Sequence, residues 1–294
     1  MKRFITLFLI GLTVLLWMQC GQAGKDKTND PIATTIFPVY DWTRELLNSE
    51  SGIINILPQG ANPHHFEPSP QTIRDLQNVR LFIGIDREFD GWVESLLPDH
   101  VQVVYLAESL ENDTKESHEM HHHNPHYWLS VRKAKVMVEA LSTALKESHA
   151  ASQDSIDFYA ARYLSRLDTL DQTIRTLLKD LPNKSFIQWH PAWNYFAEDY
   201  GLSVAGTLSH GHGDSPSIKE IQDLVNLAKK EKIRLVVQGL FEEQQITQVF
   251  ARETQATLLT LDTMGNPDVE EESTYIKMMN QNARLFAEAL QEQP

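Results

Sequence analysis

The chain has 294 residues, of which 41% are hydrophobic and 22% are charged, and this composition excludes an intrinsically disordered protein and a membrane protein with several spans. Its 40 acidic and 26 basic residues give a formal charge of -14, so most of the surface would repel a nucleic-acid duplex. The single cysteine, Cys20, leaves no thiol in the body of the chain for a disulfide, a thiolate metal site or a nucleophile, whereas the 12 histidines favour chemistry based on imidazole and carboxylate groups.

The first residues predict an export signal. Basic residues precede an uncharged apolar segment, residues 4–18, which ends just before Cys20. This segment has the length of a signal-peptide core and is shorter than the roughly 20 residues that span a bilayer. The cysteine resembles the residue that bacterial lipoproteins acylate, so we expect residues 1–19 to be a signal peptide and residues 20–31 a lipid-anchored tether. A cleaved protein without lipid and an uncleaved signal anchor are the alternatives.

Short apolar runs alternate with helical patterns over residues 32–151. The predicted strands are 32–36, 53–57, 79–85 and 101–105, and the predicted helices are 41–48, 69–76 and 89–97. Strands that alternate with helices imply a mostly parallel sheet with helices on both faces. This stretch therefore predicts an N-terminal α/β lobe.

The strongest periodic pattern in the chain lies within residues 152–182. Its apolar positions are spaced alternately by four and three residues: Ile156, Ala160, Tyr163, Leu167, Leu170, Ile174, Leu177 and Leu181. No glycine or proline interrupts the pattern before Pro182, which predicts one helix about 40 Å long with a continuous apolar face. We expect this helix to be a rigid link along the back of two lobes. A core helix in a single domain is the alternative.

The alternation of strands and helices returns over residues 183–294. The predicted strands are 185–189, 202–206, 235–238 and 257–261, and the predicted helices are 193–199, 217–230, 243–253 and 273–291. The fold class is therefore α/β, with two lobes that each contain a mostly parallel sheet, joined by one long helix, and with the functional site in the cleft between them.

Four residues with metal-binding side chains stand just past a predicted strand or just before a helix: His64, His126, His190 and Asp262. Ligands gather at the carboxyl ends of parallel strands, and because two of these residues come from each half, they can meet only between the lobes. Three imidazoles and a carboxylate satisfy the tetrahedral coordination that zinc favours. His65 competes for the first position, and we prefer His64 because it repeats the Asn-Pro-His pattern of His126.

Four motifs, taken as a set, resemble those of the metal-binding receptors of ABC importers for zinc and manganese, the ZnuA/TroA-like solute-binding proteins. They are GANPH at 60–64, NPHYW at 124–128, HPAWNYF at 190–196 and LDTM at 261–264. The resemblance covers the chain after the predicted signal peptide. It implies two α/β lobes, a rigid linking helix, a metal in the cleft and delivery of that metal to a membrane permease.

The resemblance also implies which residues bind the metal. His64, His126 and His190 match the histidine ligands of the family, and Asp262 matches its carboxylate ligand. Some zinc receptors of this type use three histidines with water or another carboxylate, and there Glu67 or Glu242 would replace Asp262.

Further histidines lie in two polar segments. His118, His121, His122 and His123 form a short acidic, histidine-rich stretch that resembles the His-rich loop of zinc-type members of the family. His210 and His212 lie among glycines in a second segment. We expect both groups to be auxiliary zinc contacts. A solvated insertion and a plain flexible loop are the respective alternatives.

The sequence thus predicts an exported, lipid-anchored and monomeric receptor that delivers Zn(II) to an ABC permease, located in the periplasm or on the outer face of the cytoplasmic membrane. Imidazole ligands favour zinc, whereas manganese prefers oxygen, and a manganese or mixed receptor is the first alternative. A surface adhesin with a structural metal is the second.

We expect no enzyme, because the zinc-hydrolase motif His-Glu-x-x-His is missing and a fourth protein ligand would occupy the position of the reactive water. A receptor of this kind would bind with a roughly nanomolar dissociation constant, and its affinity would weaken as the pH falls through about 6.5, where imidazole protonates.

Overall fold

The computed structural model describes residues 31–58, 60–61, 66–110, 124–209, 216–240, 242, 244–270 and 273–291. The predicted signal peptide, Cys20 and nearly all of the tether lie outside these ranges. Within the described residues, no helix combines the length and the apolar character that a bilayer crossing requires.

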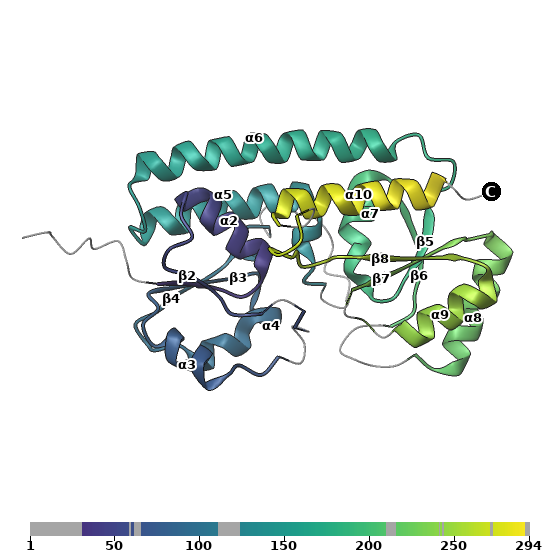
Figure 1. Ribbon diagram of the computed structural model, residues 1–294, viewed down its shortest axis with the longest axis horizontal. Helices are drawn as coiled ribbons and strands as arrows, with labels where there is room; N and C mark the ends of the chain where they lie inside the picture. Colours follow the sequence, from purple (N-terminus) through teal and green to yellow (C-terminus); the bar gives the residue numbers. More distant parts are fainter. Residues whose placement is uncertain are drawn as a thin grey trace, which may run out of the picture.

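Two parallel four-stranded sheets form the two halves of the molecule (Figure 1). The first half contains β1 (Ile32–Thr34), β2 (Ile53–Asn55), β3 (Leu81–Gly84) and β4 (Gln102–Tyr105), in the order β2-β1-β3-β4. The second half contains β5 (Ser185–Gln188), β6 (Ser203–Thr207), β7 (Leu235–Gly239) and β8 (Thr257–Leu261), in the equivalent order β6-β5-β7-β8. All eight strands lie within or beside the predicted runs, and the predicted α/β class is confirmed.

The principal helices of the first half are α2 (Phe37–Leu47), α3 (Pro70–Leu76), α4 (Arg87–Asp90) and α5 (Val131–Glu147). Those of the second half are α7 (Asn194–Tyr200), α8 (Ile218–Glu231), α9 (Gln244–Thr254) and α10 (Tyr275–Gln291). Four short 3-10 helices accompany them: η1 (Gly91–Leu96), η2 (Leu106–Leu110), η3 (Tyr127–Leu129) and η4 (Pro191–Trp193).

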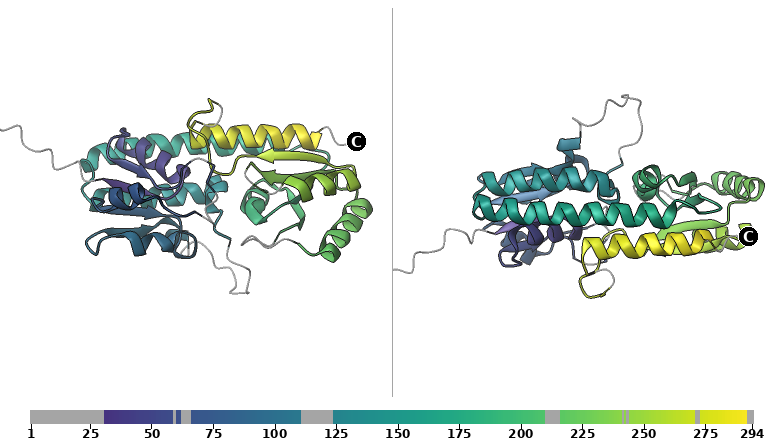
Figure 2. Two further views of the ribbon diagram at one scale, coloured as in Figure 1. Left: turned by 60° about the horizontal axis from the view of Figure 1, so that its bottom comes forward. Right: turned by 90° about the horizontal axis from the view of Figure 1, so that it is seen from above.

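The long helix α6 (Gln153–Leu178) runs beside both halves (Figure 2). Its buried residues follow the predicted spacing as far as Ile174 and then shift from Leu177 to Leu178, the last helical residue. The helix ends at Leu178 and does not include Leu181, which the spacing had placed in it. Pro182 disfavours helical geometry at Leu181, the residue that precedes it. The helix contacts α5 and α2 of the first half and α10 of the second, and one hydrophobic cluster continues through both halves.

Two helix predictions need correction. α2 begins at Phe37 rather than Asp41, because Pro38 in its first turn has the backbone angle that a helix start requires. The predicted helix over 89–97 is instead α4 followed by η1, and the change of helix type falls at Gly91, a weak helix former. Asp86 caps α4 by accepting a hydrogen bond from the Phe89 amide at 2.9 Å.

Candidate metal centre

His126 lies in the loop that leads into α5, immediately before η3. Its side chain is buried, and its backbone N–H donates to Asn124 Oδ1 at 3.1 Å. Ser130 then caps α5 through its hydroxyl, which accepts from the Lys133 amide at 3.0 Å. Hydrogen bonds therefore hold the loop on both sides of His126.

This loop is hydrogen-bonded to the second half of the molecule. Trp128 Nε1 donates to Thr263 O at 2.6 Å, and Tyr275 Oη donates to Trp128 O at 2.7 Å. Tyr195 Oη donates to Asn124 O at 3.1 Å. Burial, with a smaller contribution from the neighbouring Tyr127, raises the pKa of Tyr195, so its hydroxyl keeps the proton that it donates. His126 precedes α6 in the sequence, yet its loop is held by the C-terminal half.

His190 follows β5, where the backbone pairs with β7 through the hydrogen bond from Trp189 N to Val237 O at 2.8 Å. Gln188 fixes the start of the loop: its Nε2 donates to Asn194 Oδ1 at 2.6 Å, and its Oε1 accepts from Trp193 N at 3.1 Å. In the order β6-β5-β7-β8 the chain connections change direction between β5 and β7. Ligands of open α/β sheets bind at the carboxyl side of such a switch point, where His190 lies.

The two imidazoles face each other across the boundary between the halves. Nε2 of His126 lies 3.1 Å from Nε2 of His190, and the ring centroids are 4.8 Å apart. On the opposite edge of its ring, Nδ1 of His190 contacts Oε1 of Glu242, which follows β7. Two nitrogens bound to one tetrahedral zinc at 2.0–2.1 Å lie about 3.3 Å apart, so the Nε2 atoms have nearly the separation that a shared zinc requires.

Asp262 follows β8 and is buried. Its Oδ1 accepts hydrogen bonds from the amides of Met264 at 2.8 Å and Gly265 at 3.0 Å, and its Oδ2 accepts from Gly265 at 3.0 Å. Asn282 of α10 holds the backbone here by donating from Nδ2 to Asp262 O at 2.6 Å. The carboxylate is therefore directed into its own loop, and among the described residues Oδ2 accepts one hydrogen bond, from Gly265.

The structure brings together His126 and His190 and does not join Asp262 to them. Over the described ranges, no group of three or more His, Cys, Asp and Glu side chains is close enough to hold a metal. Glu67, one proposed substitute for Asp262, is exposed. The other sequence-predicted histidines lie outside the described residues: His64, His65, His118, His121, His122, His123, His210 and His212.

Sequence reasoning missed the residues that hold the two imidazoles. From the sequence, Glu242 was predicted only as a possible metal ligand. In the structure it contacts His190 at Nδ1, on the ring edge that faces away from His126. Asn124 was only part of a motif, although its Oδ1 lies 2.7 Å from His126 Nδ1. An amide two residues before a histidine is the signal that could have indicated the second contact.

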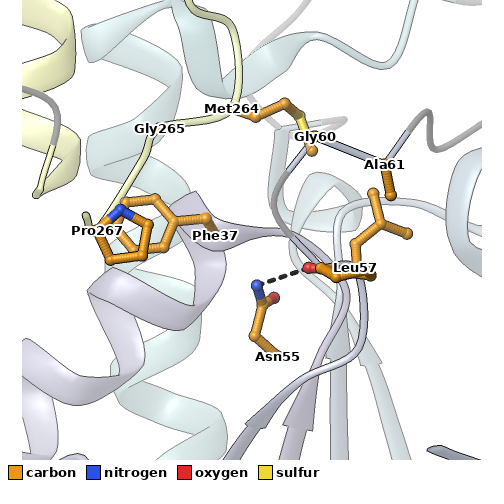
Figure 3. A pocket seen from close by; sticks show the side chains of 9 residues that line it. Phe37, Asn55, Leu57, Gly60, Ala61, Met264, Gly265 and Pro267 are labelled. Atoms are coloured by element: carbon orange, nitrogen blue, oxygen red, sulfur yellow. Dashed lines mark hydrogen bonds between the residues drawn. The ribbon is translucent and has the colours of Figure 1, made fainter. Parts of the chain in front are cut away.

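A small pocket lies between α2 and the loop after β8, next to the Asp262 turn (Figure 3). Phe37 and Leu57 line it from the first half, and Met264, Gly265 and Pro267 line it from the second. Its volume of about 50 Å³ is far below the roughly 300–1,000 Å³ of sites that enclose organic ligands. This pocket has room for water or an ion.

We compared the chain with models of known protein families. The family model described as zinc-uptake complex component A, periplasmic (ZnuA) matches residues 32–289. The chain belongs to the ZnuA family. This membership covers both sheets, α6, and the loops that carry His126, His190 and Asp262.

Several known proteins are similar to this chain along most of its length. The zinc-binding lipoprotein AdcA of Streptococcus pneumoniae is 27% identical over 97% of this chain and 60% of its own length. The high-affinity zinc uptake system protein ZnuA of Bacillus subtilis is 24% identical over 98% of both chains. The solved structure of the periplasmic zinc-binding protein TroA from Treponema pallidum, 20% identical, covers 89% of this chain and 99% of its own with a TM-score of 0.80, which shows a shared fold. The chain thus spans about 60% of the length of its AdcA relatives.

Proposed function

We propose that this protein is an exported receptor that binds one zinc ion between its two halves and delivers it to the permease of an ABC importer. The observation that carries the proposal is the pair of Nε2 atoms of His126 and His190, 3.1 Å apart at the boundary between the halves. Family membership supports the same role, since the pneumococcal relative is named as a zinc-binding lipoprotein and the Bacillus relative as a zinc uptake protein.

In this proposal His126 and His190 bind zinc through Nε2, and His64 supplies the third imidazole. Asp262 supplies the fourth ligand through Oδ2, while its Oδ1 keeps the two amide hydrogen bonds that hold the turn. Four protein ligands complete a tetrahedral site and leave no position for a reactive water, so the proposed role is binding rather than catalysis. Export and lipidation of Cys20 belong to the same proposal, with the histidine-rich segments as auxiliary zinc contacts.

Manganese is the second candidate cargo. An aspartate ligand is compatible with manganese, but at a site rich in imidazole zinc binds more tightly by the Irving–Williams order. The two metals are separated by direct competition at the same site.

Calorimetric titration of the purified, metal-free protein with zinc and then manganese tests the proposal. We expect one zinc site with a roughly nanomolar dissociation constant and weaker binding of manganese. His126→Ala and His190→Ala should each lose more than about 100-fold in zinc affinity while circular dichroism shows an unchanged fold, since each removes a ligand outright. Asp262→Ala shows whether the carboxylate belongs to the site.

His100→Ala is the control, because His100 is an exposed histidine before β4. It should bind zinc as the parent protein does. Unchanged affinity in both ligand variants would refute the receptor site, and unfolding of the parent on removal of zinc would favour the structural metal of an adhesin.

A further inference from the structure

Asn124 connects the two loops that carry the histidines. Its Oδ1 lies 2.7 Å from His126 Nδ1, and its Nδ2 donates to the carbonyl oxygen of Pro191, the neighbour of His190, at 2.6 Å. Its Oδ1 also accepts the backbone N–H of His126 at 3.1 Å. These three contacts together assign the orientation of the amide, since a reversed amide would direct its donor at the His126 N–H. Because an amide oxygen only accepts, Nδ1 of His126 carries the hydrogen.

Glu242 plays the corresponding part for His190. One carboxylate oxygen, Oε1, contacts His190 Nδ1, and the other, Oε2, accepts the backbone N–H of Gly239 at 2.6 Å. Gly239 leaves room for this arrangement, since a Cβ there would lie 3.0 Å from the Glu242 carboxyl carbon. A carboxylate also only accepts, so Nδ1 of His190 carries a hydrogen as well.

In a neutral ring, these hydrogen bonds determine the state of the other nitrogen. A neutral imidazole with hydrogen on Nδ1 has a lone pair on Nε2. The lone pairs of His126 and His190 are then directed at each other across 3.1 Å, an arrangement that is repulsive between neutral rings and favourable around a cation. If either neutral ring carried its hydrogen on Nε2, the lone pair on its Nδ1 would face an oxygen that cannot donate.

We propose that Asn124 and Glu242 are positioning residues that hold His126 and His190 in the Nδ1–H form, so that both Nε2 lone pairs converge on one zinc ion before it arrives. This inference rests on the proposed zinc site. Partners of this kind, on the far nitrogen of a ligating histidine, fix its ring orientation, and their loss costs about 10- to 100-fold in metal affinity. The same assignment excludes Glu242 as a fourth zinc ligand, because it occupies the ring edge opposite Nε2.

Glu242→Gln tests the inference with little change in side-chain size. The glutamine amide can donate to Nδ1 and thereby favour the Nε2–H form of His190. We expect zinc affinity to fall about 10- to 100-fold. Long-range ¹H–¹⁵N spectra of the metal-free protein at pH 8 should show His190 with hydrogen on Nδ1 in the parent and on Nε2 in the variant. A merely structural role for Glu242 would not move this signature.

Two further variants complete the test. Glu243→Gln removes the adjacent carboxylate in the sequence and should leave both the spectrum and the affinity unchanged. Asn124→Asp keeps an acceptor at His126 Nδ1, so His126 should retain its Nδ1 hydrogen, whereas Asn124→Ala should lose this preference and zinc affinity together.

The possible results separate the two proposals. Loss of zinc binding in His190→Ala with unchanged binding in Glu242→Gln would overturn the positioning role and leave the receptor intact. An Nε2–H form of His190 in the parent protein, or a larger loss in Glu243→Gln than in Glu242→Gln, would also overturn it. Unchanged zinc binding in His190→Ala would refute the zinc site itself.

Discussion

Asp90, the last residue of α4, is a fully buried carboxyl group in the first half. Burial raises its pKa from 3.8 to about 7, although its Oδ2 accepts hydrogen bonds from the amides of Ile85 and Asp86. Gly84 is required beside it, since a Cβ there would lie 2.8 Å from Asp90 Oδ2. Asp90 therefore contributes to stability while it is protonated and opposes folding once it ionises.

The sign of this effect gives a prediction for pH. A folded pKa above the unfolded value means that stability is fully present below pH 3.8 and declines as the pH rises to about 7. Asp90→Asn keeps an acceptor for the amides and does not ionise. The free energy of unfolding of the variant minus that of the parent should therefore rise by on the order of 4 kcal/mol between pH 4 and pH 8. Urea denaturation measures this difference. Parallel pH profiles for the two proteins would contradict the account.

At the scale of elements, α2 of the first half meets α10 and the loop after β8 of the second. Asp41 of α2 accepts the Tyr275 N–H at the start of α10 at 2.8 Å and pairs with Arg44 Nε at 2.8 Å. Burial raises the pKa of Asp41, and the neighbouring Arg44 opposes that rise. In the same region Gly265 has φ +90, and a Cβ on it would lie 2.4 Å from Phe37 Cδ1.

Substitution of Gly265 measures this contact between the halves. Gly265→Ala should lower the free energy of unfolding by about 1–3 kcal/mol beyond the cost of its positive φ, because the new methyl group displaces Phe37. Gly52→Ala is the matched control, since Gly52 has φ +79 and nothing lies within 4 Å of its Cβ position. Urea denaturation of both variants measures the two losses in free energy of unfolding. Equal losses would mean that the approach of Phe37 to Gly265 contributes nothing.

Most elements were predictable because local patterns specify them. The β-branched runs marked the strands, and the uninterrupted spacing of four and three marked α6. The limits of α2 and the division of 89–97 depend on Pro38 and Gly91, whose effects on helix ends are weaker signals than periodicity. The strand-end positions of His190 and Asp262 also followed from the sequence, whereas their partners did not, because hydrogen bonds between distant loops have no period.

At the scale of the whole molecule, the His126 loop links the two halves. The His126 loop precedes α6 but is bonded to Thr263, Tyr195 and Tyr275 of the second half. The helix α6 runs beside both halves (Figures 1 and 2), and it packs against α2 and α5 of the first and α10 of the second.

X-ray absorption at the zinc edge of the zinc-loaded protein tests the central claim, one zinc ion held by His126 and His190. The account predicts four nitrogen and oxygen ligands, with imidazole nitrogens at about 2.0–2.1 Å, and fewer imidazoles in the His126→Ala and His190→Ala variants. A shell of six oxygens, or the same imidazole signal in the parent and in both variants, would contradict it.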